Sequence, residues 1–330
     1  MEPENKLIIL TGPTAVGKTA LSIKLAKKIK GEIVSADSMQ VYRHMDIGSA
    51  KISPQEMEGV PHHLIDILEP DEAFNVFRFK SLALEALKGI YERGHIPIVT
   101  GGTGFYIQAL LYDIDFSSEE DHSLIRTRLE EDGRTKGSVY LHECLKSVDP
   151  DSARAIHPNN LKRIIRALEF YQLTGMPISG HNQEQRKKEA FYNACYFVLN
   201  DHRDKLYGKI EKRVDAMMEA GLGAEVENLR NMGYGRDMVS MQGLGYKEIL
   251  SALEGECSLE EAVALIKRDT RRFAKRQLTW FRRERDVIWI NKPDFAYDDE
   301  RILDFMMGYI ERMDLHHGRD KECCLHKADL

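Results

Sequence analysis

The sequence is poor in several features that mark specialised classes of protein. Among its 330 residues are only 5 cysteines, an odd number, and they are scattered apart from Cys323 and Cys324. That pattern argues against a disulfide framework. No apolar run approaches the about 18 residues of a membrane span, and the polar start MEPENK lacks a secretory signal. These absences predict a cytoplasmic protein with reduced thiols and no membrane partner.

Charge is distributed unevenly along the chain. The formal net charge of -6 excludes a uniformly basic surface. Between Lys267 and Arg285, however, nine lysines and arginines face only Asp269 and Glu284. This local excess indicates an anionic partner. The last stretch, 313–330, is polar, and its histidines and cysteines fit no zinc-finger spacing, so a disordered tail is expected there.

Short apolar runs bounded by turn residues predict buried parallel strands. The runs are LIIL at 7–10, EIVSA at 32–36, HHLID at 62–66, IPIVTGG at 96–102, CYFVLN at 195–200 and VIWIN at 287–291. Helical spacing of apolar residues occupies 20–29 and 75–94, where Gly94 ends the pattern. The predicted class is α/β, with a doubly wound parallel sheet.

The strand pattern disappears between about residues 115 and 194. Short helices are predicted instead, at 123–132 ended by Gly133, at 139–148 ended by Asp149 and Pro150, and at 160–173 ended by Gly175. We therefore expect an all-helical domain at 115–194, inserted in a core domain that comprises 1–114 and 195–312. Further helices are expected at 203–220 and 258–285.

The strongest local motif is LTGPTAVGKTALS at 10–22. Gly12, Gly17, Lys18 and Thr19 have the spacing of a phosphate-binding loop, and the loop lies between a predicted strand and a predicted helix. The glycines let successive amides point at an anion, Lys18 reaches the outer phosphates, and the Thr19 hydroxyl suits magnesium. A plain glycine turn would not need Lys18 followed by Thr19. Alone, the loop would be classed as ATP-binding or nucleotide-binding.

Two further segments are expected at the same carboxyl edge of the sheet. Asp37 follows the second strand, where a carboxylate can ligate magnesium or accept a proton, although Asp37 and Ser38 would also suit a turn. Thr103 lies among the glycines of VTGGTGF. Their spacing differs from a dinucleotide fingerprint and suits a tight strand-to-helix turn equally well.

Two predicted helices carry basic faces. Lys162, Arg163 and Arg166 share one face, and Ile164, Ile165 and Leu168 face elsewhere. A second stripe, with aromatic neighbours Phe273, Trp280 and Phe281, consists of Arg268, Arg271, Lys275, Thr279 and Arg282. Such faces suit a nucleic-acid backbone, although each could be a solvated surface. A nucleoside triphosphatase is disfavoured, because only Asp66 ends an apolar strand with an acid.

An ordered series of motifs from Leu7 to about Ile290 resembles the tRNA dimethylallyltransferases, isopentenyl transferases that modify the adenine next to the anticodon. The motifs are GPTAVGKT, SADSMQVYRHMDIGSAK, PHHLIDI, GGTGFYIQALL, HPNNLKRIIRALE, MQGLGYKEI and KRQLTWFRRE. As a set they are far more specific than the phosphate loop. The resemblance implies a phosphate-loop fold of the kind found in nucleoside triphosphatases.

The resemblance also implies catalytic roles. The diphosphate of dimethylallyl diphosphate would lie on Gly12, Pro13, Thr14, Ala15, Val16, Gly17, Lys18 and Thr19. Thr19 would also hold Mg²⁺, and Arg213 would offset charge on the leaving group. Asp37 would orient or deprotonate the exocyclic amine of the adenine. The base must leave its stack to reach the electrophile.

Contacts with the tRNA anticodon stem-loop are implied as well. The residues are Asp37, Ser38, Met39, Gln40, Thr103, Arg126, Lys162, Arg163, Ile164, Ile165, Arg166, Gln242, Gly245, Tyr246, Lys247, Lys275, Arg276, Gln277 and Arg282. Lys209 stands where the family has an arginine, which leaves the role of Lys209 open. We expect a monomer.

Three alternatives remain. The first is an isopentenyltransferase acting on free adenine nucleotides, against which the helical insertion and the second basic stripe argue. The second is a small-molecule kinase with a phosphate loop, which would need a nucleoside triphosphate. The third, a non-catalytic RNA-binding module, leaves Lys18, Thr19 and Asp37 unexplained.

Overall fold

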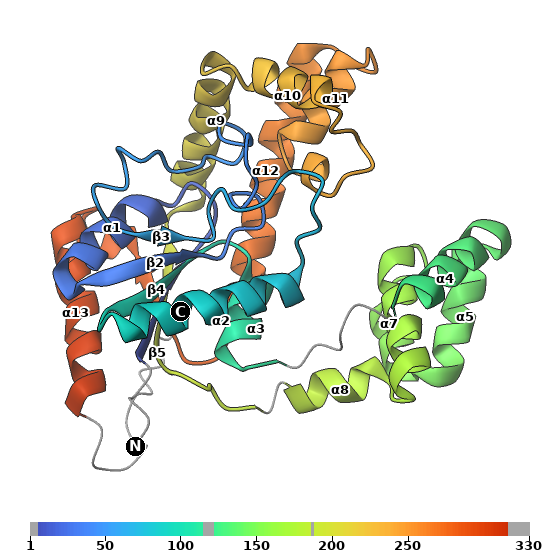
Figure 1. The fold of residues 1–330 in the computed structure, drawn as a ribbon, viewed down its shortest axis with the longest axis horizontal. Helices are drawn as coiled ribbons and strands as arrows, with labels where there is room; N and C mark the ends of the chain where they lie inside the picture. Colours follow the sequence, from blue (N-terminus) through green and yellow to red (C-terminus); the bar gives the residue numbers. More distant parts are fainter. Residues whose placement is uncertain (1–5, 115–121, 186–187, 316–330) are drawn as a thin grey trace. The chain divides into compact units, whose positions relative to one another are not determined.

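The computed structural model describes residues 6–114, 122–185 and 188–315. The chain divides into two compact units (Figure 1). The first contains the residues up to 111 and those from 192 onward, and the second contains 112–191, against the expected insertion at 115–194. The predicted tail at 313–330 falls outside the described residues, except that helix α13 continues to Leu315.

The first unit is built on a sheet of six parallel strands, in the order β3-β2-β4-β1-β5-β6. The strands are β1 Lys6–Thr11, β2 Gly31–Ser35, β3 His62–His63, β4 Ile96–Gly101, β5 Asn193–Asn200 and β6 Val287–Asn291. Strand β3 is shorter than the predicted 62–66, because Leu64 and Asp66 adopt positive φ angles of 63° and 56°. The predicted doubly wound α/β class is confirmed.

Helices cover both faces of this sheet (Figure 1). Helices α1 (Lys18–Ile29) and α13 (Asp299–Leu315) pack together on one face, and α2 (Val76–Glu92) and α3 (Gly104–Leu111) pack on the other. Strand β1, central in the sheet, is buried from Leu7 to Thr11. Its apolar run therefore lies in a core closed on both sides, as expected for parallel strands.

The remaining helices of this unit follow strand β5. They are α9 Arg203–Glu219, α10 Leu222–Asn231, α11 Tyr246–Leu253 and α12 Leu259–Phe281, with short 3-10 helices η2 Ser240–Gln242 and η3 Lys292–Phe295. Ser258 begins α12 with a capping box to Glu261. The helix ends at Phe281 and not at the predicted 285, because Arg282 caps it and the chain turns at Asp286, where φ is 56°, to enter β6.

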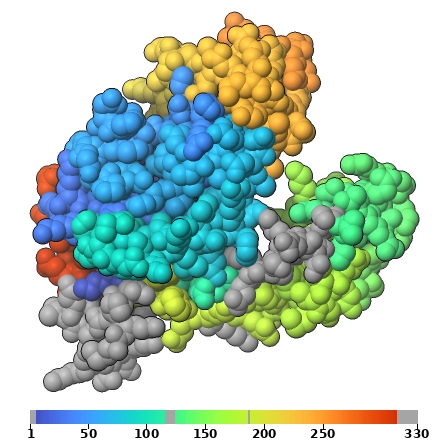
Figure 2. Space-filling view, viewed as in Figure 1, coloured from blue at the N-terminus to red at the C-terminus, as the bar shows by residue number. Residues whose placement is uncertain are grey.

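A long segment without regular helices connects β2 to α2. We call residues 37–51 the Asp37 loop. Lys51 organises it from inside, since its side chain is only 4% exposed and its ammonium bonds to the carbonyl of Tyr42 and the carboxylates of Asp46 and Asp66. Figure 2 shows this segment in blue beside α10 and α11, which are yellow and orange.

The second unit consists of helices α4 His122–Lys136, α5 Ser138–Val148, α6 Pro150–Ala155, α7 Leu161–Thr174 and α8 Ile178–Gln185. Gly175 ends α7 in the left-handed conformation, as predicted. Gly133 does not end α4, which was an error of the sequence prediction. A β-carbon at Gly133 would lie 3.0 Å from Leu161, so glycine here serves close packing of α4 on α7.

A buried carboxylate on β2 connects this strand to β3 and to the residues just before β4. Glu32 on β2 has a side chain that is 1% exposed, and its oxygens bond to Arg93 at 2.7 and 2.8 Å and to His63 and His95 at 2.7 Å. The charged bond from Arg93, assisted by both histidines, lowers the pKa of Glu32 to about 2 despite its burial. The ionised form of Glu32 therefore stabilises the fold.

The Glu32→Gln variant should unfold more easily at neutral pH, by about 1–3 kcal/mol, because the charge-assisted bonds are lost. The Glu32 pKa is lower in the folded chain than in the unfolded chain. Its contribution is thus complete above about pH 4.5 and is lost as the pH falls toward 2.

Urea denaturation of both proteins near pH 7 and near pH 4 measures this effect. The difference in the free energy of unfolding between Glu32→Gln and the unmodified protein should be smaller at the lower pH. Glu92→Gln, at an exposed pair with Lys88, is the control. An equal difference at both pH values would contradict the prediction.

Candidate active site

The phosphate loop connects β1 to α1 at the carboxyl edge of the sheet. Its first turn requires glycine, since a β-carbon on Gly12 would lie 2.5 Å from the carbonyl oxygen of Leu199 on β5. Ala15 and Gly17 have φ angles of 63° and 101°, and α1 begins at the next residue. The amides of the loop and of the start of α1 are thereby arranged as in an anion-binding site.

Lys18 lies across this loop and is held in place by it. Its ammonium donates to the carbonyl oxygens of Gly12 at 3.0 Å and Pro13 at 2.9 Å. Burial lowers the pKa of Lys18 to about 8, while the charge of Asp37 raises it and the charge of Arg213 lowers it. Arg213 is exposed on α9, yet partial desolvation also lowers the pKa of its guanidinium, against the effect of Asp37. Three side chains that are far apart in sequence therefore influence one another electrostatically.

Asp37 forms the turn that was considered as the alternative to a catalytic role. Its Oδ1 accepts from the amides of Met39 at 2.8 Å and Gln40 at 3.4 Å. Within the described residues no hydrogen bond reaches Oδ2, and the residue is partly exposed. The two interpretations are thus compatible, because one oxygen fixes the loop and the other stays available to a ligand.

Gln277 on α12 braces the phosphate loop. Its Oε1 accepts from the amide of Thr14 at 2.9 Å, and its Nε2 donates to the carbonyl of Gly102 at 2.9 Å. A β-carbon at Gly102 would lie 2.1 Å from that nitrogen. Gln277 is 5% exposed, so in the free chain it connects two backbone segments, and its contact with tRNA stays a prediction. The Thr14 amide is thus engaged, and the Val16 amide donates to the Pro13 carbonyl at 3.4 Å, which leaves the remaining amides of the loop for an anion.

The turn after β4 is glycine-rich for a related reason. Trp280 of α12 lies against Gly104, where a β-carbon would approach its ring to 2.2 Å. The amide of Thr103 donates to the carbonyl of Ala36 at 3.3 Å, which joins this turn to the residue before Asp37. Thr103 thus lies beside the Asp37 loop. Phe281, predicted as aromatic surface, is fully buried in the core.

The basic stripe of α12 is partly neutralised by the chain itself. Arg268 pairs with Asp269 at 2.9 Å, and Arg271 pairs with Glu211 at 2.6 Å. Exposed cations remain further along the helix and at its end, namely Lys275, Arg276 and Arg282. The available positive surface is therefore concentrated in the half of α12 that carries Gln277 and Trp280.

In the second unit, the basic face of α7 is present as predicted. Lys162 and Arg163 are exposed, and Arg166 pairs with the buried Glu169 at 3.2 Å. On α4, Arg126 is exposed and lies 3.8 Å from Glu130. Ile164 and Ile165 are 0% and 4% exposed in the core of this unit. Their side chains are thus part of the core in the free chain, and the predicted contact of this segment with tRNA stays a prediction.

The residues around α11 that were predicted to contact tRNA differ in their exposure to solvent. Gln242 is exposed, and Lys247 lies 3.5 Å from Glu248. Gly245 and Tyr246 are buried in the free chain, and the phenol of Tyr246 is fully enclosed, while their contact with tRNA stays a prediction. Lys209, whose role was open, pairs with the buried carboxylate of Asp201 at 2.6 Å.

Magnesium fits this site if the substrate supplies most of the ligands. The described residues gather no group of three histidine, cysteine or acidic side chains. Thr19 is exposed at the first turn of α1, and Asp37 is partly exposed. Magnesium commonly binds one or two protein oxygens together with phosphate oxygens and water. The Thr19 hydroxyl, with or without Asp37, is consistent with that pattern.

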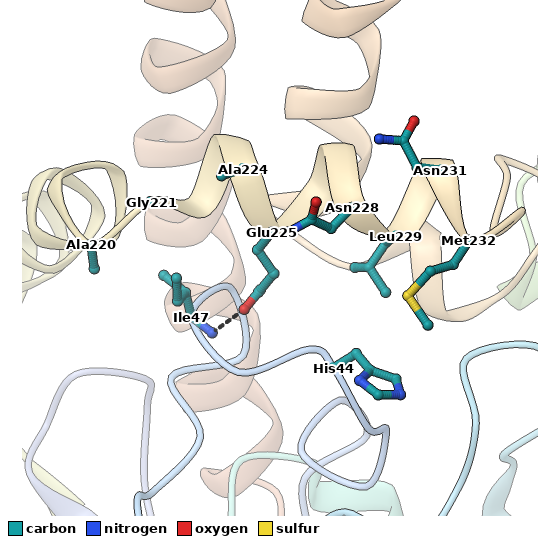
Figure 3. Close-up of a pocket in the computed structure, with 10 residues that line it drawn as sticks. All are labelled: His44, Ile47, Ala220, Gly221, Ala224, Glu225, Asn228, Leu229, Asn231 and Met232. Atoms are coloured by element: carbon teal, nitrogen blue, oxygen red, sulfur yellow. Dashed lines mark hydrogen bonds between the residues drawn. The ribbon is translucent and has the colours of Figure 1, made fainter.

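A cleft of about 720 Å³ lies elsewhere in the first unit (Figure 3). It is lined by α10 and by the part of the Asp37 loop that contains His44 and Ile47, and it includes none of the phosphate-loop residues. Separately, no helix in the described part of the chain has the length and apolar character needed to cross a bilayer.

Comparison with known proteins identifies the family. Residues 40–284 match the family model named IPP transferase. The chain belongs to the IPP transferase family. A tRNA dimethylallyltransferase from Lachnoclostridium phytofermentans is 63% identical over 306 residues, which cover 93% of this chain and 98% of that relative. A second, from Acetivibrio thermocellus, is 51% identical with 93% and 97% covered. The family predicted from the motifs is confirmed.

Solved structures of the same family resemble the fold. The full-length tRNA isopentenylpyrophosphate transferase from Bacillus halodurans is 43% identical, with a TM-score of 0.72 and coverage of 96% of this chain and 100% of that one. A eukaryotic dimethylallyltransferase described as acting on tRNA is 30% identical, with a TM-score of 0.80 and coverage of 94% and 80%. Both comparisons extend over nearly the whole IPP transferase chain described here.

Sequence inspection missed residues that act through long-range contacts. Gln277 was expected at the surface, and Lys292 was not considered, although its ammonium lies 3.3 Å from where a β-carbon of Gly17 would stand. Gln277 is a polar residue in a segment of basic residues, and nothing in that local sequence indicates that its side chain is buried. The glycines at 102 and 104 were the available signal, since each marks a close approach by another element.

The pH dependence of diphosphate binding should reveal the lowered pKa of Lys18. Above about pH 8 the free protein loses the Lys18 proton, while a bound diphosphate restores it. The dissociation constant of dimethylallyl diphosphate should therefore rise toward about tenfold per pH unit between pH 8 and pH 9.5. Calorimetry at constant magnesium measures it. Lys18→Arg should remove the dependence, and a flat profile in the unmodified protein would refute it.

Gln277→Ala should weaken dimethylallyl diphosphate binding by about tenfold, because the Thr14 amide and the Gly102 carbonyl lose a buried partner. Affinity for tRNA should change little. Calorimetry with dimethylallyl diphosphate and filter binding with tRNA separate the two effects. Lys275→Ala, two residues earlier and exposed, is the matched comparison and should show the reverse pattern. A loss confined to tRNA affinity in Gln277→Ala would instead favour the contact role.

Proposed function

We propose that this chain transfers the dimethylallyl group of dimethylallyl diphosphate to the exocyclic N6 amine of the adenine next to the anticodon of tRNA, releasing diphosphate. The observation that carries the proposal is the electrostatic grouping of Lys18, Arg213 and Asp37 at the sheet edge of a chain from this family. Two cations there suit a leaving diphosphate. One carboxylate there suits an amine that must lose a proton.

The bond changes define what each residue must do. The bond between the allylic carbon and the diphosphate oxygen breaks, and a bond from N6 to that carbon forms. Diphosphate leaves with the electron pair, and the amine loses one proton, which Asp37 Oδ2 can accept. Negative charge therefore grows on the leaving oxygens, where the loop amides, Lys18 and Arg213 stabilise it.

A magnesium ion held near Thr19 would supply further stabilisation of charge on the diphosphate. Thr19 and the start of α1 would orient the diphosphate so that its allylic carbon faces the Asp37 side. The target adenine must be unstacked to reach this edge. The exposed cations of the second half of α12 suit the RNA backbone, as do those of α7 in the second unit. The monomeric state and the cytoplasmic location stay predictions.

The direct test is an incubation with magnesium, dimethylallyl diphosphate and an unmodified anticodon stem-loop that has adenine next to the anticodon. Digestion and mass spectrometry should find adenosine carrying one five-carbon unit. A stem-loop with guanine at that position is the matched control, and AMP tests the alternative activity on free nucleotides. The proposal is overturned if AMP is the better acceptor, or if ATP supports phosphate transfer and no prenylated adenosine forms.

Asp37→Asn should lower kcat by roughly 10²–10⁴-fold, because the amide cannot take up the amine proton. The variant keeps an oxygen that can accept from the Met39 amide, so the loop and the affinity for tRNA should be retained. Single-turnover kinetics and filter binding measure the two quantities. If tRNA affinity falls and the chemical step is unaffected, Asp37 is a binding residue and not a base.

A further inference from the structure

Glu225 on α10 receives an unusual set of hydrogen bonds. Its Oε2 accepts from the amides of Asp46 at 3.0 Å and Ile47 at 2.7 Å, and its Oε1 accepts from the amide of Gly48 at 3.0 Å. Figure 3 shows Glu225 pointing from α10 to the loop at Ile47. Three successive amides that converge on one anion form a nest. Here the anion is a carboxylate of the same chain, so α10 holds the Asp37 loop from outside.

Tyr246 completes this contact. Its hydroxyl donates to Glu225 Oε1 at 2.8 Å, and its side chain is fully buried. Burial raises the pKa of Tyr246, so the phenol remains a donor. The ring also lies against Gly48, where a β-carbon would approach it to 2.5 Å. Glu225 is therefore held between three loop amides and one phenol that has no room to move.

The contact at 46–48 is connected to Asp37 through the loop. The Ala50 amide donates to the Ile47 carbonyl at 3.0 Å. The carbonyl of Ala50 accepts from Gln40 Nε2 at 3.3 Å, and the Gln40 amide donates to Asp37 Oδ1 at 3.4 Å. A displacement of 46–48 would thus be passed to the carboxylate of Asp37.

The same helical segment touches the loop region at two more places. Gly243, between η2 and α11, has Met39 so close that a β-carbon would lie 2.5 Å from its methyl carbon. The hydroxyl of Ser240 donates to the carbonyl of Pro70 at 2.6 Å, and both groups are buried. The segment from α10 to α11 therefore contacts the Asp37 loop at Met39 as well as at 46–48, and it also contacts the chain beyond the loop at Pro70.

We propose that Glu225, together with Tyr246, is a positioning residue for Asp37: it fixes the loop that presents the carboxylate to the adenine, without touching substrate itself. The inference rests on the proposed function of Asp37. Residues of α10 and α11 would then determine the position of a carboxylate that lies much earlier in the chain. Because small misplacements of a reacting group are costly, loss of the contact should slow the chemical step more than substrate binding.

The test measures kcat and both KM values for Glu225→Gln, Asp37→Asn and the double variant. Glu225→Gln should lower kcat by about tenfold, with KM for dimethylallyl diphosphate unchanged. The double variant should be no slower than Asp37→Asn alone, because a residue that acts through Asp37 adds nothing once the base is gone. Amide hydrogen exchange at 46–48 should become faster in Glu225→Gln.

Controls keep the outcomes separate. Glu227→Gln changes an exposed acid on the same helix that lies 3.9 Å from Arg230, and it should leave kcat and exchange unchanged. If Glu225→Gln does not fold, Tyr246→Phe removes one of the bonds to the carboxylate and should give a smaller fall in kcat. The inference is overturned if Asp37→Asn slows the reaction while Glu225→Gln and Tyr246→Phe do not, or if the two losses multiply in the double variant. If Asp37→Asn reacts as fast as the unmodified protein, Asp37 is not the base, and both the proposed role of Asp37 and this inference are wrong.

Discussion

The site depends on the parallel pairing of β1 with β4 on one side and β5 on the other. Parallel strands place their carboxyl ends at one edge of a sheet, so the segments that follow them share that edge. The phosphate loop follows β1, the Thr103 turn follows β4, and α9 with Arg213 comes shortly after β5. The close approach of Gly12 to Leu199 shows how tightly this pairing restricts the first turn of the loop.

The charged side chains at this edge have an excess of one positive charge, which favours an anionic ligand. Lys18 is partly buried and Arg213 is exposed on α9, and the carboxylate of Asp37 offsets part of the repulsion between the two cations. A diphosphate would add the negative charge that the two cations lack. One oxygen of Asp37 accepts from the amides of its own turn, and within the described residues no hydrogen bond reaches the other.

The phosphate loop and the Asp37 loop are each braced by elements from the carboxyl-terminal third of the chain. Gln277 of α12 bonds to the first, and Glu225 of α10 with Tyr246 of α11 bonds to the second. Gln277 is buried and Glu225 is partly buried, and each bonds to backbone groups that the loop itself leaves unsatisfied. These bonds hold each of the two loops to a helix that comes much later in the chain.

The sequence by itself determined the features that depend on near neighbours. The spacing of Gly12, Gly17, Lys18 and Thr19, the apolar strands and the stop at Gly175 follow from local backbone geometry, and the ordered motifs predicted the family. Only the tertiary structure decided which polar residues are braces and which are surface. Gln277, Tyr246 and Ile165 lie in segments rich in polar or basic residues, yet contacts with distant elements bury them. Gly133 likewise read as a helix end, although packing by Leu161 explains it. Burial depends on partners far along the chain, which local patterns do not contain.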